Sequence, residues 1–164
     1  MDFMATTKGY STLQVTLHWL IVLLIGINYF ISDAMARAID VRLEGGAVTA
    51  TAPWIHVYTG IGVLVLVLLR LGVRAFRGTP EHPDTAPAWT AQLANLSHWL
   101  LYGLLIVVPV LGLLAWFGGV APAGDWHVIA MNALLILAGL HAVAALAHHY
   151  LLKDDVLRRM MRPQ

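Results

Sequence analysis

The segment from Trp126 to Tyr150 constrains the fold most strongly, because it is long and apolar enough to cross a bilayer yet contains four histidines. These residues are His127, His141, His148 and His149. Polar side chains are costly inside a membrane, so several of them in one apolar span indicate a functional site. The segment therefore predicts a membrane-spanning helix whose histidines bind a ligand.

The spacing of His127 and His141 indicates what that ligand is. The two residues are fourteen positions apart, close to four turns of a helix. On a helix their directions differ by about 40° and their heights by roughly 21 Å. Two histidines on one face, one near each membrane surface, predict two metal centres stacked across the bilayer.

The composition extends the membrane interpretation to the whole chain. Hydrophobic residues make up 59% of the sequence and charged residues 12%, whereas a soluble domain has about 25% charged residues. The apolar residues form long blocks, which indicates contact with lipid as well as with a core. We expect an all-α membrane protein, a four-helix bundle in one domain over residues 1–164. The expected helices span about 13–32, 53–76, 92–117 and 126–151.

The connections and the orientation follow from the polar residues. Residues 32–53 are expected to form a polar loop and residues 118–125 a tight turn, with a kink rather than a break at Pro109. Eight of the ten Lys and Arg residues lie on the side of the chain termini, and only Arg37 and Arg42 lie opposite. This asymmetry predicts that both termini are cytoplasmic. The outer loops mix positive and negative charges and show no obvious electropositive funnel.

The chain contains no cysteine and eight histidines. The absence of cysteine excludes disulfides, cysteine-ligated iron–sulfur clusters, thiolate ligation of haem and covalent c-type haem attachment. Histidine is left as the obvious metal ligand. No block of basic residues interleaved with aromatic residues points to nucleic acid.

The expected helices sort the histidines by depth. His56 and His127 each begin a helix on the outer side, so we expect them to form one pair. The inner pair contains His18 with either His141 or His148. The expected depth of His18 in the membrane lies between the depths of these two candidates. The spacing alone leaves this choice open.

Other interpretations of the polar and small residues compete with a metal role. A lone histidine in a membrane helix often makes an interhelical hydrogen bond, and for His98 that role is as plausible as a functional one. His82 lies between prolines in a loop, where we expect it to be solvated. Zinc or copper transport predicts acidic or thiol partners, and the interiors of the expected helices contain no Asp, Glu or Cys. Small residues allow either a planar ring to approach closely or helices to pack; they are Gly26, Gly60, Gly62, Gly112 and Gly139.

Four segments, which cover most of the chain, resemble the bacterial cytochrome b561 family of four-helix membrane cytochromes. They are YSTLQVTLHWL, IHVYTGIGVLVLVLLRL, SHWLLYGLLIVVPVLGL and GLHAVAALAHHYLLKDDVLRRMMRP. The resemblance implies two haems b with bis-histidine ligation, one held by His18 and His141 and the other by His56 and His127. It leaves His148 at the family's inner quinone site.

The resemblance to superoxide-oxidising members of this family also implies an activity. Bis-histidine ligation leaves no open iron position, so the haems are expected to carry electrons, here from periplasmic superoxide to ubiquinone at the bacterial inner membrane. His148 is then expected to donate a hydrogen bond or a proton. Arg70 and Arg74 are candidates for binding haem propionates, or serve only as positive-inside anchors. The alternative is an electron-transfer subunit that links the quinone pool to a dehydrogenase or a periplasmic redox protein.

Overall fold

The structure is a computed structural model that describes residues 9–80 and 88–163. Within these ranges the regular elements are helices, and no strand is found. The long helices are α1 (Thr12–Phe30), α3 (Thr51–Arg77), α4 (Ala88–Trp116) and α5 (Ala121–Ala147). All four are long and apolar enough to cross a membrane, which confirms the predicted all-α bundle. The prediction for His82 lies outside the described residues.

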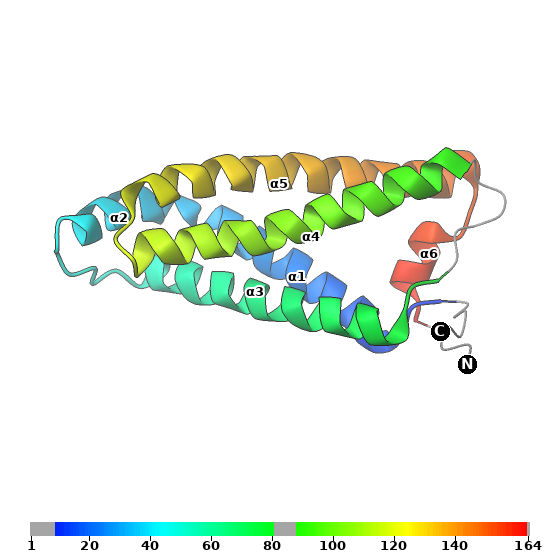
Figure 1. Ribbon diagram of the computed structural model, residues 1–164, viewed down its shortest axis with the longest axis horizontal. Coiled ribbons are helices and arrows are strands. Elements are labelled where there is room, and N and C mark those ends of the chain that lie inside the picture. Colours follow the sequence, from blue (N-terminus) through cyan, green and yellow to red (C-terminus); the bar gives the residue numbers. More distant parts are fainter. Residues whose placement is uncertain (1–8, 81–87, 164) are drawn as a thin grey trace.

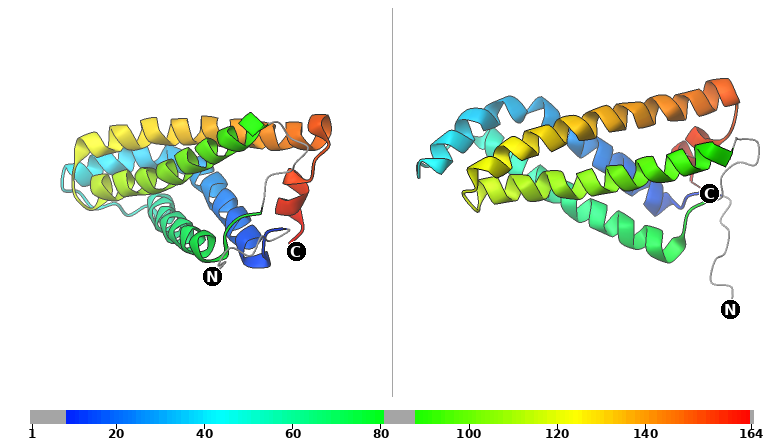
Figure 2. Two further views of the ribbon diagram at one scale, coloured as in Figure 1. Left: turned by 45° about the vertical axis from the view of Figure 1, so that its right-hand side comes forward. Right: turned by 45° about the horizontal axis from the view of Figure 1, so that its top comes forward.

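The long helices run roughly along the longest axis of the molecule (Figure 1). α4 packs side by side with α5, and α1 with α3, while α3 also packs against α4. In the views of Figure 2, α3 lies on the side of α4 away from α5, whereas α1 crosses behind α4. We call the end where α2 lies the α2 end, and the opposite end, where α6 lies, the α6 end (Figure 1).

The start of α1 is fixed by a capping box at the α6 end. Ser11 Oγ accepts a hydrogen bond from the Gln14 N–H, and the Gln14 side chain accepts one from the Ser11 N–H at 3.0 Å. Gln14 Nε2 also donates to the carbonyl of Gly78 at 3.1 Å. Gly78 ends α3 with a positive φ of 70°, which glycine adopts without steric cost. One glutamine thus ties the start of α1 to the end of α3.

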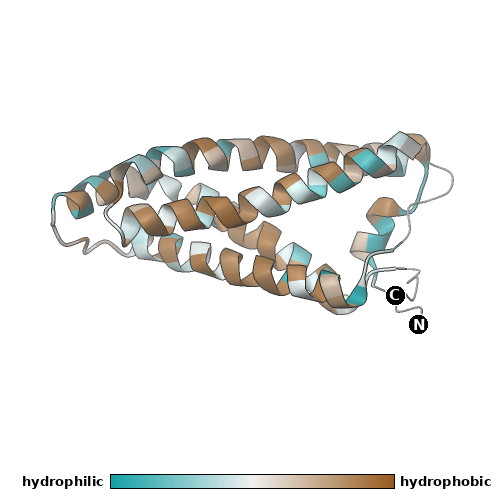
Figure 3. Ribbon diagram, in the orientation of Figure 1, coloured by the Kyte–Doolittle hydropathy of each residue, from teal (hydrophilic) through white to brown (hydrophobic). Residues whose placement is uncertain are grey.

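The interior of the bundle is apolar and the outer surface is apolar as well. A buried cluster draws side chains from all four long helices: Ile21, Val63, Val67, Tyr102, Leu105, Val108 and Leu134. Hydrophobic residues also cover the outward faces of the long helices (Figure 3), and Phe30 is 83% exposed and Phe76 92% exposed. Apolar surface on both sides is what a helix needs when its outer face meets lipid.

The prediction of a polar loop over residues 32–53 was wrong. This segment contains a short 3₁₀ turn, η1 (Ser32–Ala34), and the helix α2 (Met35–Leu43). Ala38 of α2 is buried in a cluster with Val57 and Trp116, whereas Arg37 and Asp40 are exposed. α2 is therefore a short amphipathic helix, whose few apolar residues are easily overlooked between long apolar blocks.

The helix boundaries also differ from the predicted ones. α5 begins at Ala121, before the predicted start at 126, because Pro122 occupies its first turn, where the missing N–H is tolerated. The predicted turn over residues 118–125 is accordingly shorter, and it includes Gly119 with φ 66°. α4 continues through Pro109 without a break. Beyond α5 the chain forms a π-helical turn, η2 (His148–Leu152), and a last short helix, α6 (Val156–Met161).

Candidate functional site

The α2 end holds a histidine pair with the spacing of two ligands on one metal. The ring centroids of His56 on α3 and His127 on α5 lie 6.2 Å apart, with an angle of 68° between the ring planes. A bond from a metal to an imidazole nitrogen is about 2 Å long, so two imidazoles on opposite sides of one metal have ring centres roughly 6 Å apart. The predicted outer pair is thus brought together at a distance that suits an iron between the rings.

Groups around these histidines set the positions of their rings. The Nδ1 atom of His127 lies 2.7 Å from the carbonyl oxygen of Val108, and a carbonyl can only accept, so Nδ1 carries the proton and Nε2 is left as the ligand atom. Gly112 makes room for the ring, because a Cβ there would lie 3.1 Å from two atoms of His127. Among the described residues, the buried Nδ1 atom of His56 makes no hydrogen bond of normal geometry, and the backbone of Asn28 lies close by.

Three histidines from three helices gather towards the α6 end. His98 on α4 and His141 on α5 are in edge contact, with ring centroids 5.1 Å apart. His18 on α1 lies close enough to both rings for charges on them to interact with its own. The predicted partners His18 and His141 therefore share one group, which also includes His98. The contact between His98 and His141 is shorter than the spacing of two ligands on opposite sides of one iron.

α5 connects the two histidine groups and is unusually uncovered. Only 6% of its apolar span is buried inside the protein, against 22% to 33% for the other three spans. Within residues 9–80 and 88–163, α5 has extensive backbone contacts with α4 but not with α1 or α3, which carry His18 and His56. Side chains therefore reach across the bundle from α5 towards those helices. The sparse backbone packing of α5 against α1 and α3 fits a planar macrocycle held between these helices.

Arg70 and Arg74 lie on α3 at the α6 end, each in contact with Tyr102. Arg70 donates from Nε to Tyr102 Oη at 3.2 Å and from Nη1 to the Gln14 carbonyl at 2.5 Å. Its charge also acts on His18 and His141. The guanidinium of Arg74 lies 5.9 Å from the ring centroids of both Trp99 and Tyr102. Both arginines are thus held in the bundle near the histidine group, and their binding of propionates stays a prediction.

Tyr10 precedes α1, outside the membrane spans, and belongs to the same region. Burial raises the pKa of its phenol above the ordinary value of 10.0, against the opposing charges of Arg74 and Arg70. Tyr10 is therefore protonated at neutral pH and is a potential hydrogen-bond donor at the α6 end. The sequence analysis had assigned it no role.

The α2 end presents one cation, Arg42, against three aromatic rings. Its guanidinium lies 4.9 Å from the centroid of Trp116, 5.7 Å from that of Phe117 and 5.8 Å from that of Trp54. Its Nε also donates to the Trp116 carbonyl. Arg42, Trp116 and Phe117 line an open cleft of about 300 Å³. Within the part of the chain that the structure describes, the buried Nε1 of Trp116 has no hydrogen-bond partner. The fold thus brings a cation together with three aromatic rings, which the mixed charges of the outer loops did not reveal.

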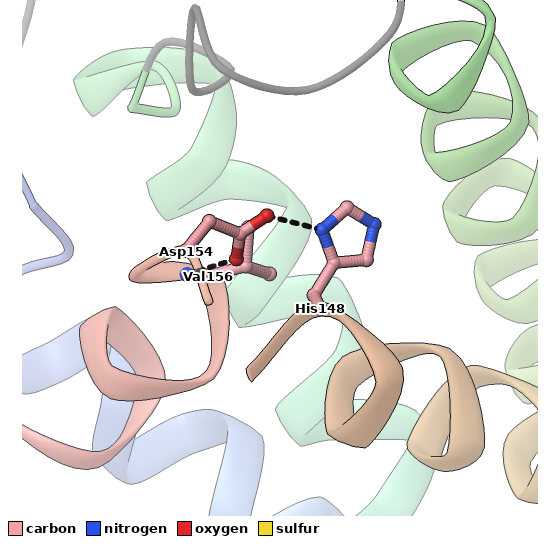
Figure 4. A network of polar contacts seen from close by, with 3 residues as sticks. All are labelled: His148, Asp154 and Val156. Carbon is pink, nitrogen blue, oxygen red and sulfur yellow. Dashed lines mark hydrogen bonds and ion pairs between the residues drawn. The ribbon is translucent and has the colours of Figure 1, made fainter. Parts of the chain in front are cut away.

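His148 lies beyond α5, in the π-helical turn at the α6 end. Its Nδ1 atom lies 2.5 Å from Oδ2 of Asp154 (Figure 4). The sequence analysis assigned His148 to the quinone site and gave Asp154 no role. The acid was missed because it lies in the basic tail, six positions away in sequence, and only the turn of the chain after α5 brings it back to the histidine.

Comparison with known proteins identifies the scaffold that carries these groups. A model of the prokaryotic cytochrome b561 family matches residues 9–163. The chain belongs to this family. As a cytochrome b561 protein it is a multi-pass membrane protein that transfers electrons, and the family implies b-type haem. The histidine groups described above are the side chains that fit such a cofactor.

Three relatives have names that bear on function. Cytochrome b562 of Cereibacter sphaeroides is 44% identical and covers 98% of this cytochrome b561 protein and 100% of its own length. The probable superoxide oxidase CybB of Yersinia pestis is 33% identical, and the match covers 94% of this chain and 96% of the relative. Cytochrome b561 homolog 1 of Escherichia coli is 30% identical, and the match covers 93% of this chain and 96% of the relative.

Proposed function

We propose that this cytochrome b561 protein is a superoxide:quinone oxidoreductase of the bacterial inner membrane, with two haems b. Two superoxide anions, one quinone and two protons would give two dioxygen molecules and one quinol. The observation that carries the proposal is α5, which contributes His127 to the histidine pair at one end and His141 to the group at the other. When bound, haem b supplies one-electron redox chemistry, and bis-histidine ligation leaves no position for dioxygen.

The proposed ligands are one pair at each end of the bundle. His56 and His127 would hold the haem at the α2 end, as their ring spacing suggests. His18 and His141 would hold the haem at the α6 end, a pairing supported by the sequence resemblance and by the electrostatic reach between the two residues. His98 would then pack against the edge of the His141 ring, and Arg70 and Arg74 would bind propionates.

The proposed place of superoxide is the cleft beside Arg42 at the α2 end, which the distribution of Lys and Arg assigns to the periplasm. The guanidinium attracts a small anion, and the aromatic rings around it hold the charge in place without neutralising it. Trp54, whose ring lies beside the Arg42 guanidinium, precedes His56 by two residues on α3. An electron delivered here would enter next to the His56–His127 pair.

The proposed place of the quinone is the α6 end, next to His148. Reduction of a quinone adds protons as well as electrons, so a group that can donate a proton is needed there. Histidine is suited to this task because its ordinary pKa lies near neutral pH. The ubiquinone head group would thus accept a hydrogen bond from His148, on the cytoplasmic side of the membrane.

The direct test follows haem absorbance in the purified protein under anaerobic conditions. A pulse of superoxide should reduce the haems, and ubiquinone added next should oxidise them again. Superoxide dismutase added before the pulse should abolish the reduction, and a sample without protein gives the uncatalysed rate. Haems that stay oxidised after the pulse would contradict superoxide as the electron donor.

An electron-transfer subunit is the second candidate function. It is favoured by the relative from Cereibacter sphaeroides, which is 44% identical and is named only as a cytochrome. This function predicts that the protein is isolated from membranes in mild detergent together with a dehydrogenase or a periplasmic redox protein. It also predicts haem reduction by that partner and none by superoxide.

A further inference from the structure

We propose that Asp154 is the positioning residue of His148: its carboxylate fixes the imidazole in the Nδ1–H form and turns Nε2 towards the quinone. The proposal rests on the function proposed above and extends it to a residue outside the histidine groups. Oδ2 of Asp154 and Nδ1 of His148 are 2.5 Å apart, and their side chains are 2% and 15% exposed. Figure 4 shows the two side chains facing each other, with the second ring nitrogen on the far side of the imidazole.

The backbone is shaped to bring these two residues together. After α5 the chain widens into the π-helical turn η2 and then reverses at Lys153, which adopts the left-handed conformation with φ 55°. As a result the Asp154 N–H donates to the His148 carbonyl at 3.1 Å, in addition to the side-chain contact. π-Turns occur at helix C-termini, and here the turn leads the chain back so that Asp154 reaches His148.

The second carboxylate oxygen anchors Asp154 from the other side. Oδ1 accepts the N–H of Val156 at 3.1 Å, at the start of α6. α6 is in turn tied to α1, because Trp19 Nε1 donates to the Met160 carbonyl at 2.9 Å. The carboxylate therefore has one oxygen for the backbone and one for His148, and it has little freedom to rotate away.

This geometry has a chemical consequence for proton transfer. A carboxylate accepts but does not donate, so the proton of a neutral His148 is held on Nδ1 and the lone pair is on Nε2. In the imidazolium form, Asp154 balances the positive charge and Nε2–H is free to donate to a quinone carbonyl. When the quinone receives its two electrons from superoxide, the Nε2–H bond breaks and an O–H bond forms on the quinone. Cytoplasmic water supplies the second proton and later reprotonates Nε2, which Asp154 keeps in position.

An asparagine at position 154 separates this role from the hydrogen bond to Val156. Its amide oxygen can still accept the Val156 N–H, so that hydrogen bond is kept. Its NH₂ group would then face Nδ1 of His148 and donate to it, which moves the ring proton to Nε2. The same exchange in a serine protease triad preserves the geometry and impairs catalysis through the wrong tautomer. Asp155 provides the matched control, because its side chain is 65% exposed and lies 3.7 Å from Arg158.

The experiment compares Asp154→Asn with Asp155→Asn in the full-length, haem-loaded protein. Nitrogen NMR of ¹⁵N-histidine protein, recorded in the diamagnetic reduced state, reports the tautomer, and His148→Gln identifies the His148 signals. We expect the Nδ1–H form in the wild type and in Asp155→Asn, and the Nε2–H form in Asp154→Asn. Oxidation of the reduced haems by ubiquinone should slow about tenfold or more in Asp154→Asn alone, with haem content unchanged.

The possible results test the positioning role of Asp154 and the proposed function separately. An unchanged tautomer in Asp154→Asn, or a wild-type rate of quinone reduction, would overturn the positioning role. Loss of haem from Asp154→Asn would also overturn it, since it would show that Asp154 only maintains the fold. A wild-type protein whose haems no quinone oxidises would refute the proposed function, and the NMR comparison would still decide whether Asp154 sets the tautomer of His148.

Discussion

The two ends of the bundle differ in what surrounds their histidines. At the α2 end, His56 and His127 face each other at 6.2 Å, and the nearby charge is Arg42 among aromatic rings. At the α6 end the histidines are accompanied by groups that carry protons, including Tyr10 and the His148–Asp154 pair. Under the proposed function, the first end would receive an electron from a small anion. The second end would supply protons to the quinone.

Under the proposed function, one helix serves two kinds of chemistry. α5 carries ligand candidates fourteen residues apart for both ends, and its backbone then leaves α-helical geometry at His148, where a further histidine is needed for another task. At the α2 end, the candidate ligands lie within the continuous helices α3 and α5. The α6 end also needs the turn η2 and the helix α6, which fold the tail back over the bundle (Figure 1).

The largest expected effect comes from removing a ligand at the α6 end, where three histidines compete for the role. His18→Ala should remove one of the two proposed haems, whereas His98→Ala should retain both. The measurement is haem per protein from the pyridine haemochrome spectrum. One haem lost from His98→Ala and none from His18→Ala would show that His98 is the ligand.

The next effect is a partial weakening of the α2 end by Gly112→Ala. The added Cβ would lie 3.1 Å from the His127 ring, so the ring has to move by a few tenths of an ångström. We expect the haem at this end to dissociate at a lower temperature, while the other haem is unaffected. Gly103→Ala on the same helix is the control, because a Cβ there meets nothing within 4 Å. Equal behaviour of the two variants would refute the close fit at His127.

A kinetic effect confined to the α2 end is expected from Arg42→Gln. The rate of haem reduction by superoxide should fall about tenfold and become less dependent on ionic strength, because steering of the anion is lost. Oxidation by ubiquinone should keep its rate. Arg37→Gln is the control, since Arg37 lies on the exposed side of the same helix. A similar loss in both variants would indicate general surface charge rather than the Arg42 cleft.

The smallest effect concerns Tyr10 and alkaline stability. The pKa of its phenol is raised in the folded protein, so the unfolded chain loses this proton first, near pH 10. Its stabilising contribution is therefore complete below pH 10 and is lost as the pH rises further. The thermal midpoint should fall less between pH 9 and about 11 in Tyr10→Phe than in the wild type. Tyr150→Phe, at a residue that is 70% exposed, should behave like the wild type.

Long-range patterns in the sequence were sufficient for the bundle and for the meeting of His56 with His127. The four apolar blocks predicted the spans, and the helical position of His56 and His127 predicted that they meet. The contact of His98 with His141 could not be predicted, because it depends on how α4 rotates against α5. Asp154 and Arg42 were missed for a related reason: each acts through a short segment, η2 or α2, whose geometry is set by packing on the bundle rather than by periodicity.

The haem content of His127→Ala tests whether α5 supplies one ligand to each of two haems, as we propose. The pyridine haemochrome spectrum should fall from two haems per chain to one, and the remaining haem should still be oxidised by ubiquinone. His149→Ala, at an exposed histidine near the end of the same apolar span, should keep both haems. Retention of both haems in His127→Ala would contradict the claim.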